Sequence, residues 1–206
     1  MAPSDDRSTE ERILEAAHTV FVREGTRSAS LKDIAQEADV NQALLHYYFS
    51  DKKTLADTVF EQVASDFIPQ IQEVFVAQQP VEEKVEKIVQ KYMHLLNNNP
   101  YLPLYVVGEL NQNPDEMKER IRTMGLAPFD DLDLLDEQLR RRAEDGELRP
   151  ISAEQFVVNL LSLCIFPFIA RPLIETMFGM EEDAFERFIE KRAQQIPDFF
   201  LDGLRP

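Results

Sequence analysis

Apolar residues recur with a helical period along most of the chain, most clearly within residues 30–53. The first apolar stripe there consists of Leu31, Ile34, Ala35 and Ala38. Ser30 precedes this stripe and is suited to cap a helix N-terminus. Asp39 and Val40 follow as a turn, and Asn41 is a good cap for a second short helix. The pattern therefore predicts two short helices joined by a tight turn.

The second short helix, over residues 42–49, has two unlike sides. At about 100° per residue, one side carries Gln42, Ala43, His46 and Tyr47. The other side carries Leu44, Leu45 and Tyr48, with Phe49 near the boundary. One side can pack against the protein, while the other is free to contact a partner.

Helical periodicity extends in both directions from this segment. Residues 9–24 form an amphipathic stripe that ends at Gly25 and completes a three-helix core. Later helices are predicted at residues 54–76 with a bend or an end at Pro69, then at 85–96, 102–110, from Pro114, at 126–143, 152–178 and 181–204. The last two meet at Gly179. No segment alternates like a strand, so the predicted fold is all-α with about nine helices.

Length and composition fit this fold. The chain has 206 residues, of which 44% are hydrophobic, enough for a real core. Cys164 is the only cysteine and no apolar leader begins the chain, so we expect a reducing cytoplasm. The longest apolar stretch, residues 156–170, contains Asn159, Ser162 and Pro167 and falls short of the roughly 20 residues needed to span a bilayer. We therefore expect no membrane association.

A helix-turn-helix places the N-terminal residues of its second helix against base edges in the major groove. The Gln42 amide can donate to and accept from adenine, and Ala43 can contact a thymine methyl group. His46 and Tyr47, one turn on, are better placed for phosphates. The alternative is that these helices are plain core and that the polar side is only solvated.

Two lysines follow the second short helix. Ser50 or Asp51 can cap a third helix, which puts Lys52 and Lys53 in its first turn. A lysine there opposes the helix dipole, but a bound phosphate would draw on both the free N–H groups and the ammonium. Otherwise the two are ordinary surface lysines.

Three segments in order, ILEAAHTVFVREG, SLKDIAQEADV and LLHYYFSDKKTL, resemble the N-terminal DNA-binding domain of the tetracycline-repressor (TetR) family of bacterial regulators. The resemblance implies a helix-turn-helix domain over residues 1–53 and a helical effector-binding and dimerisation domain over 54–206. It implies DNA contacts at Lys32, Gln42, Ala43, His46, Tyr47 and Lys52, to which we add Asn41 at the start of the recognition helix. His46 departs from the Tyr that is frequent in relatives, which makes that phosphate contact weaker or pH-dependent.

A formal net charge of −16 is an objection to DNA binding, because affinity for a polyanion rests on Lys and Arg. Residues 1–53 hold seven basic and ten acidic residues, a net of −3, which leaves −13 for the remainder. A few cations, namely Arg27, Lys32, Lys52 and Lys53, must therefore replace a basic patch. We expect modest nonspecific affinity and a shallow salt dependence. A salt-rich cytoplasm is an alternative cause of the acidity.

The last two predicted helices hold eight of the fourteen phenylalanines. Two helices cannot bury so many aromatic rings between themselves, so we expect a homodimer through a four-helix bundle. The expected interface residues are Phe166, Ile169, Leu173, Phe185, Phe188 and Phe199. A dimer would place two recognition helices about 34 Å apart on an inverted-repeat operator. The alternative is that these rings pack on other C-terminal helices.

Pro167 and Pro172 lie inside a predicted helix, where each costs about 3 kcal/mol. One hypothesis is a kink that opens a pocket for a largely apolar small-molecule effector. Its expected lining is Met93, Leu96, Tyr105, Phe129, Leu160 and Cys164. The other hypothesis is that the helix only bends around the protein core and opens no pocket. The family resemblance implies repression that ligand binding releases, although the sequence leaves the sign open.

An enzyme is the main competing class. His18, His46 and His94 lie far apart, no Cys/His cluster has metal-ligand spacing, and the six glycines form no phosphate-binding loop. We therefore expect no cofactor, no metal site and no catalysis. His94 is either a pocket group or an exposed histidine. An all-helical protein-interaction module that binds no DNA remains the alternative function.

Overall fold

The computed structural model describes residues 8–124 and 132–206, and these are helical without strands. The helices are α1 (Thr9–Ser28), α2 (Leu31–Glu37), α3 (Gln42–Tyr48), α4 (Lys52–Val76), α5 (Val81–Asn98), α6 (Leu102–Gln112), α7 (Pro114–Thr123), α8 (Asp133–Glu144), α9 (Ala153–Ile169), α10 (Arg171–Phe178) and α11 (Glu182–Gly203). The described residues thus form eleven helices, two more than expected.

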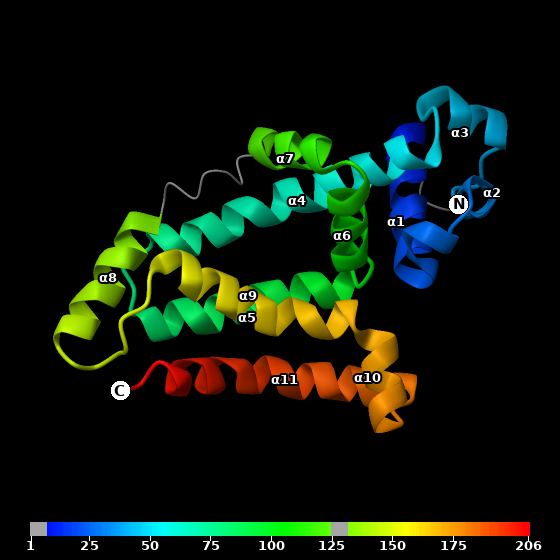
Figure 1. Ribbon diagram of the computed structural model, residues 1–206. Helices are drawn as coiled ribbons and strands as arrows, with labels where there is room; N and C mark the ends of the chain where they lie inside the picture. The colour runs from blue at the N-terminus through cyan, green and yellow to red at the C-terminus, as the bar shows by residue number, and fades with distance from the viewer. Residues whose placement is uncertain (1–7, 125–131) are drawn as a thin grey trace, which may run out of the picture.

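Helices α1 to α3 form a small group at one end of the molecule, and α4 leads away from them along its length (Figure 1). Helices α5, α9 and α11 lie alongside one another beneath α4, and α8 stands at the end opposite α1 to α3 (Figure 1). Pro69 lies inside α4, which continues past it to Val76. A single helix therefore connects the N-terminal group to the larger part of the protein.

Side-chain caps start the N-terminal helices. Ser30 accepts a hydrogen bond from the Asp33 N–H, and Asn41 accepts one from the Leu44 N–H at 2.7 Å, as expected for these caps. Asp51, rather than Ser50, caps α4. Helix α1 does not end at Glu24 but resumes beyond Gly25, whose φ of 75° interrupts it, and reaches Ser28.

The buried apolar residues form two clusters that meet along α4. The first cluster combines α1 to α3 with the first half of α4, as far as Phe60, and with residues of α6 and α7. The second begins at Ile71 and includes the buried faces of α5, α8, α9 and α11. The N-terminal core therefore continues past Lys53, the expected domain boundary, into α4.

The predicted helix over residues 152–178 is wrong. The chain forms α9 and α10 instead, which meet at Ala170 with a bend of 70°. Pro172 takes the second position of α10, where a missing N–H breaks no intrahelical bond. The predicted start of the 126–143 helix lies outside the described residues. No single described helix is long and apolar enough to cross a membrane; α9 and α10 approach that requirement only as a bent pair.

Pro167 lies inside α9, and α11 compensates for the bond that it removes. Proline has no N–H, so the Leu163 carbonyl four residues earlier loses its intrahelical donor. The Arg192 guanidinium donates to that oxygen through Nε at 3.1 Å and through a terminal nitrogen at 2.9 Å. A charged side chain from α11 thus satisfies the carbonyl that Pro167 leaves open.

We predict that Arg192→Met lowers the free energy of unfolding by about 1–3 kcal/mol, since it leaves a partly buried carbonyl without a donor. In a Pro167→Ala background the alanine N–H can donate to that carbonyl. Arg192→Met should then lower the free energy of unfolding by only a fraction of the loss seen with Pro167 present. Urea denaturation of the four proteins measures this coupling. Arg187→Met, an exposed change on the same helix, is the control. An equal loss in both backgrounds would contradict this account.

Candidate nucleic-acid interface

The turn between α2 and α3 has a defined backbone geometry. The Val40 N–H donates to the Ala35 carbonyl at 2.9 Å and the Asp39 N–H to the Gln36 carbonyl at 3.2 Å, which is the Schellman pattern. Asp39 has a φ of 52°, as this motif requires. Arg12 of α1 donates to the Ala38 carbonyl at 2.7 Å. These bonds set the angle at which α3 leaves the domain.

Helix α3 exposes the four residues expected on its polar side, Gln42, Ala43, His46 and Tyr47. Tyr47 is 81% exposed, while Leu45 beneath it is completely buried. Tyr48, expected to pack inward, is exposed instead and meets Tyr47 edge to face at 5.3 Å. The helix ends at Tyr48, so Phe49 adopts extended backbone and turns into the core. The outward side is therefore one residue wider than predicted.

The cations near α3 differ in their availability. Arg27 and Lys32 are exposed, and Asn41 lies at the exposed start of α3. The Lys52 ammonium donates to the carbonyls of Arg27 at 3.1 Å and Ala29 at 2.9 Å. Lys52 therefore joins the start of α4 to the end of α1. It is not an ordinary surface lysine.

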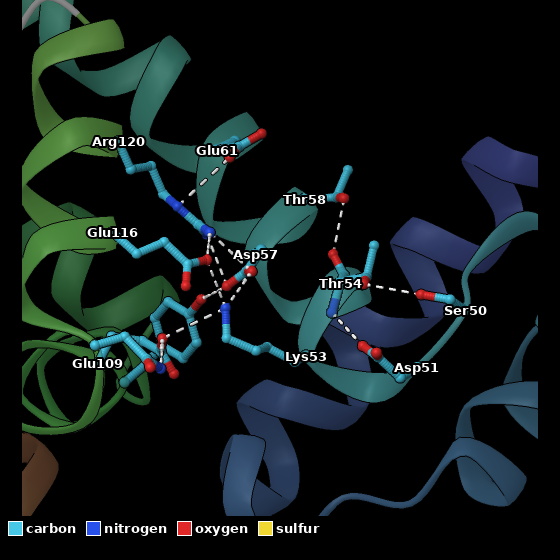
Figure 2. A network of polar contacts seen from close by, with 12 residues as sticks. Ser50, Asp51, Lys53, Thr54, Asp57, Thr58, Glu61, Glu109, Glu116 and Arg120 are labelled. Atoms are coloured by element: carbon cyan, nitrogen blue, oxygen red, sulfur yellow. Dashed lines mark hydrogen bonds and ion pairs between the residues drawn. The ribbon is translucent and has the colours of Figure 1, made fainter.

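Lys53 lies among carboxylates of α4, α6 and α7 (Figure 2). Its ammonium is 2.9 Å from Asp57, 2.8 Å from Glu116 of α7 and 3.7 Å from Glu109 of α6. Hydrogen bonding to Glu116, above all, raises the pKa of Lys53 and holds its positive charge. Lys53 therefore connects α4 to α6 and α7, and these carboxylates hold its charge, so it is not one of the cations available to DNA.

Asp57 is the centre of this network (Figure 2). It accepts a hydrogen bond from the Tyr105 hydroxyl of α6 and pairs with Arg120 of α7 at 2.6 Å. Partial burial pushes the pKa of Asp57 upward, but the hydrogen bonds from Arg120, Tyr105 and Lys53 outweigh it, so the pKa lies below its usual range. The carboxylate thus stays ionised between three donors and ties three helices together.

Few exposed cations near α3 imply a weak dependence on salt. We predict a slope of roughly −5 for log affinity against log salt in a dimer that uses Arg27, Lys32 and Lys52 from each chain. Fluorescence anisotropy with a nonspecific duplex between about 50 and 200 mM salt measures this slope. A slope steeper than about −7, typical of eight or more phosphate contacts, would be inconsistent with this set of residues.

A cavity of about 430 Å³ lies between α4, α5, α6 and α9. Its walls are almost entirely apolar, with Gln72 and Tyr92 as the polar exceptions. Of the residues expected to line a pocket, Leu96 belongs to this wall. Helix α6 presents Leu102, Val106 and Leu110 to the cavity. The space is therefore suited to an apolar ligand.

The other expected pocket residues lie elsewhere. Met93, Leu160 and Cys164 are packed in the core, and burial raises the pKa of the Cys164 thiol to about 12. Tyr105 belongs to the network around Asp57, and Phe129 lies outside the described residues. The sequence predicts a pocket beside a kink at Pro167. There the Arg192 guanidinium donates to the Leu163 carbonyl, which the proline leaves without an intrahelical donor. The cavity lies between three consecutive helices, α4, α5 and α6, and α9, which is distant from them in sequence.

The expected dimer residues also separate into groups. Phe166, Leu173 and Phe199 are exposed by 57%, 56% and 69%. Phe185 is buried inside the protomer, with the Arg171 guanidinium 4.7 Å from its ring centre, and it is not an interface residue. Phe188 is half-buried beside it, and Ile169 lines the cavity. The alternative, packing within one chain, thus holds for Phe185.

Two family models together span most of the chain. Residues 13–59 match the model described as bacterial regulatory proteins, tetR family. Residues 60–196 match the model described as the C-terminal region of YsiA-like protein. The chain belongs to the TetR family. This TetR-family protein is a DNA-binding transcriptional regulator, and the predicted all-α fold with an N-terminal helix-turn-helix is confirmed.

Relatives of this TetR-family protein are regulators too. It is 25% identical over 138 residues to the fatty acid metabolism regulator protein of Bacillus subtilis (strain 168), a match that covers 67% of this chain and 70% of that protein. The crystal structure of FadR from Bacillus subtilis in complex with stearoyl-CoA is 18% identical, with a TM-score of 0.62 over 95% of this chain and 99% of that one. A TetR/AcrR-family regulator from Thermobifida fusca YX-ER1 is 16% identical, with a TM-score of 0.61 over 96% and 98%. These likenesses show the fold.

Proposed function

We propose that this protein is a repressor that binds an inverted-repeat operator as a homodimer and is released by a long-chain acyl effector. It acts by binding alone, without catalysis. The observation that carries the proposal is the apolar cavity, one wall of which is α6, the helix that also contacts α4. Residues 8–53 would recognise DNA, and the helices from α4 onward would bind the effector and the second chain.

The proposed DNA contacts follow from exposure and chemistry. Gln42 and Ala43 stand at the N-terminal end of α3, where a recognition helix contacts base edges. His46, Tyr47 and Lys32 are exposed beside them and would contact phosphates. Asn41 and Lys52 would add contacts at the two ends of the helix.

The acyl class of effector is supported by the cavity. Ligand sites are commonly about 300–1,000 Å³ and mostly apolar, and this cavity of about 430 Å³ has both properties. A flexible alkyl chain can fill such a space without leaving a polar group unsatisfied. The FadR structure from Bacillus subtilis holds stearoyl-CoA, which makes acyl thioesters reasonable first candidates.

Helix α6 links the cavity to the DNA-binding end. One of its sides presents Leu102 and Val106 to the cavity, and the other holds Tyr105 against Asp57 of α4. A ligand that moves α6 would therefore act on α4, whose first turn is joined to α1 by Lys52. An effector that prefers one position of α6 would shift the dimer away from the spacing that fits DNA.

Selection of bound fragments from genomic DNA, followed by anisotropy with the selected duplex, tests the whole proposal. We expect one enriched inverted repeat and its release by micromolar stearoyl-CoA. Enrichment of no sequence by a folded dimer would refute operator binding. Enrichment without release by any acyl compound would refute the effector class alone.

The dimer rests on exposed apolar residues of α9 and α11, chiefly Val158, Phe166 and Phe199. We predict that Phe199→Glu raises the dimer dissociation constant by at least tenfold, because burying a charge without a partner costs several kcal/mol. Sedimentation velocity over a concentration series measures this constant. Leu104→Glu on α6, where the leucine is 52% exposed, is the matched control. Equal behaviour of the two variants would place the interface elsewhere.

A further inference from the structure

We propose that a polar groove beside the cavity binds the anionic head group of the acyl ligand. The groove lies between α1, α4 and α5 and has a volume of about 610 Å³. This inference rests on the proposed function, since it describes the other end of the same ligand. It adds a binding subsite with its own residues and its own chemistry.

The groove and the cavity share a wall. Val63 and Phe67 of α4 and Leu95 of α5 line both spaces. These three residues separate a polar surface on one side from an almost wholly apolar space on the other. A ligand that passes between α4 and α5 would therefore place its chain in the cavity and its head group in the groove. The pair of spaces suits an amphipathic molecule.

The groove is rich in nitrogen donors. Lys91 of α5 donates to the neutral amide oxygen of Gln70 at 3.2 Å, and within the described residues it has no carboxylate within ion-pair distance. Asp66 is the one acidic residue that lines the groove, against Lys91 and two histidines. In a chain with 38 acidic and 22 basic residues, one lysine against one carboxylate means that the acidic excess is absent from the groove. An anion is the complementary ligand for the Lys91 ammonium.

His94 adds a second donor in its neutral form. Its Nε2 atom lies 3.0 Å from the Asn98 amide nitrogen and accepts that hydrogen bond. A neutral imidazole that accepts at Nε2 carries its proton on Nδ1, which can then donate. His94 is exposed and lines the groove one turn beyond Gln90 and Lys91. Lys91 and His94 would therefore hold the head group together.

His18 of α1, at the DNA-binding end of the protein, also lines this groove. Its Nε2 atom donates to the Asn99 side-chain oxygen at 2.7 Å, and Asn99 donates to the Leu95 carbonyl at 3.0 Å. His18 belongs to α1, whereas Asn99 lies between α5 and α6. A bound head group would thus lie next to a contact between α1 and the helices that form the cavity.

Binding of palmitate, palmitoyl-CoA and methyl palmitate to the full-length protein tests this subsite. The three probes share one chain and differ in the head group. We expect the wild type to bind both anionic probes at least tenfold more tightly than the methyl ester. Lys91→Gln should weaken the anionic probes by roughly tenfold and leave the ester unchanged. His94→Phe should act in the same direction with a smaller factor.

Lys87→Gln is the matched control, because Lys87 lies one turn earlier on α5, bonds to Gln79 and does not line the groove. A loss for both anionic probes in Lys91→Gln supports recognition of negative charge on either a carboxylate or a phosphate. A loss for palmitate alone supports recognition of the carboxylate, and a loss for palmitoyl-CoA alone supports recognition of its phosphates. An equal loss for the ester, or the same effect in Lys87→Gln, would overturn the subsite while the acyl effector stands. Failure of all three probes to bind the wild type would overturn both.

Discussion

Gln42→Ala is expected to weaken operator binding by about 2–6 kcal/mol per dimer, because each half-site loses a base contact of about 1–3 kcal/mol. Gln42 stands exposed at the first position of α3, beyond the Asn41 cap and the turn held by Arg12. The side chain makes no contribution to the core, so the fold should be unchanged. Anisotropy with the selected operator and with single-base variants of it measures the effect.

The pattern across sequences distinguishes base contacts from phosphate contacts. Gln42→Ala should lose discrimination at one base pair, whereas Tyr47→Ala should weaken all duplexes about equally. Gln62→Ala changes an exposed glutamine on α4, away from α3, and is the control for effects of a Gln→Ala change that do not involve base contacts. If Gln42→Ala bound the operator as tightly as Gln62→Ala, base reading by this residue would be ruled out.

Asp57→Asn should lower the free energy of unfolding by about 2–4 kcal/mol, since Arg120 then keeps its charge without its principal partner. The side chains of Arg120 and Asp57 are 12% and 14% exposed, so solvent screens their pairing only weakly. Arg140→Met breaks an exposed pair with Glu144 and should cost no more than about 1 kcal/mol. Urea denaturation of both variants and the wild type gives the comparison.

The same variant carries a pH signature with a definite sign. Because the pKa of Asp57 is lowered in the folded protein, its contribution to stability is fully present above its unfolded pKa of about 3.9. It is lost as pH falls through the lower folded value. Wild-type stability should thus fall more steeply below about pH 4 than that of Asp57→Asn. Parallel curves for the two proteins below that pH would argue against this role.

Asp57→Asn also probes communication between the two ends of the molecule. The variant keeps α3 and its cap intact, so operator affinity without effector should change little. Release by stearoyl-CoA should require more ligand, because α6 is then less firmly joined to α4. Loss of operator binding in a folded variant would instead show that the network positions α3 directly.

The sequence alone determined the parts of the protein that depend on near neighbours in the chain. Ser30 and Asn41 cap helices because their side chains reach an N–H three residues later. The exposed side of α3 follows from the period of the helix and from Leu45 beneath it. The TetR resemblance is carried by these local features, which is why the family and the fold class could be predicted.

Only the tertiary structure decided which distant residues meet. Lys53 and Lys52 are adjacent in sequence, yet one bonds to Glu116, 63 residues away, and the other to carbonyls of α1. Helical period indicates that a side chain faces inward or outward, but not which helix it meets. The cavity wall, the burial of Phe185 and the bond from Arg192 to Leu163 all depend on how α4, α6, α9 and α11 pack. Packing between helices distant in sequence selects these contacts, and no local pattern records it.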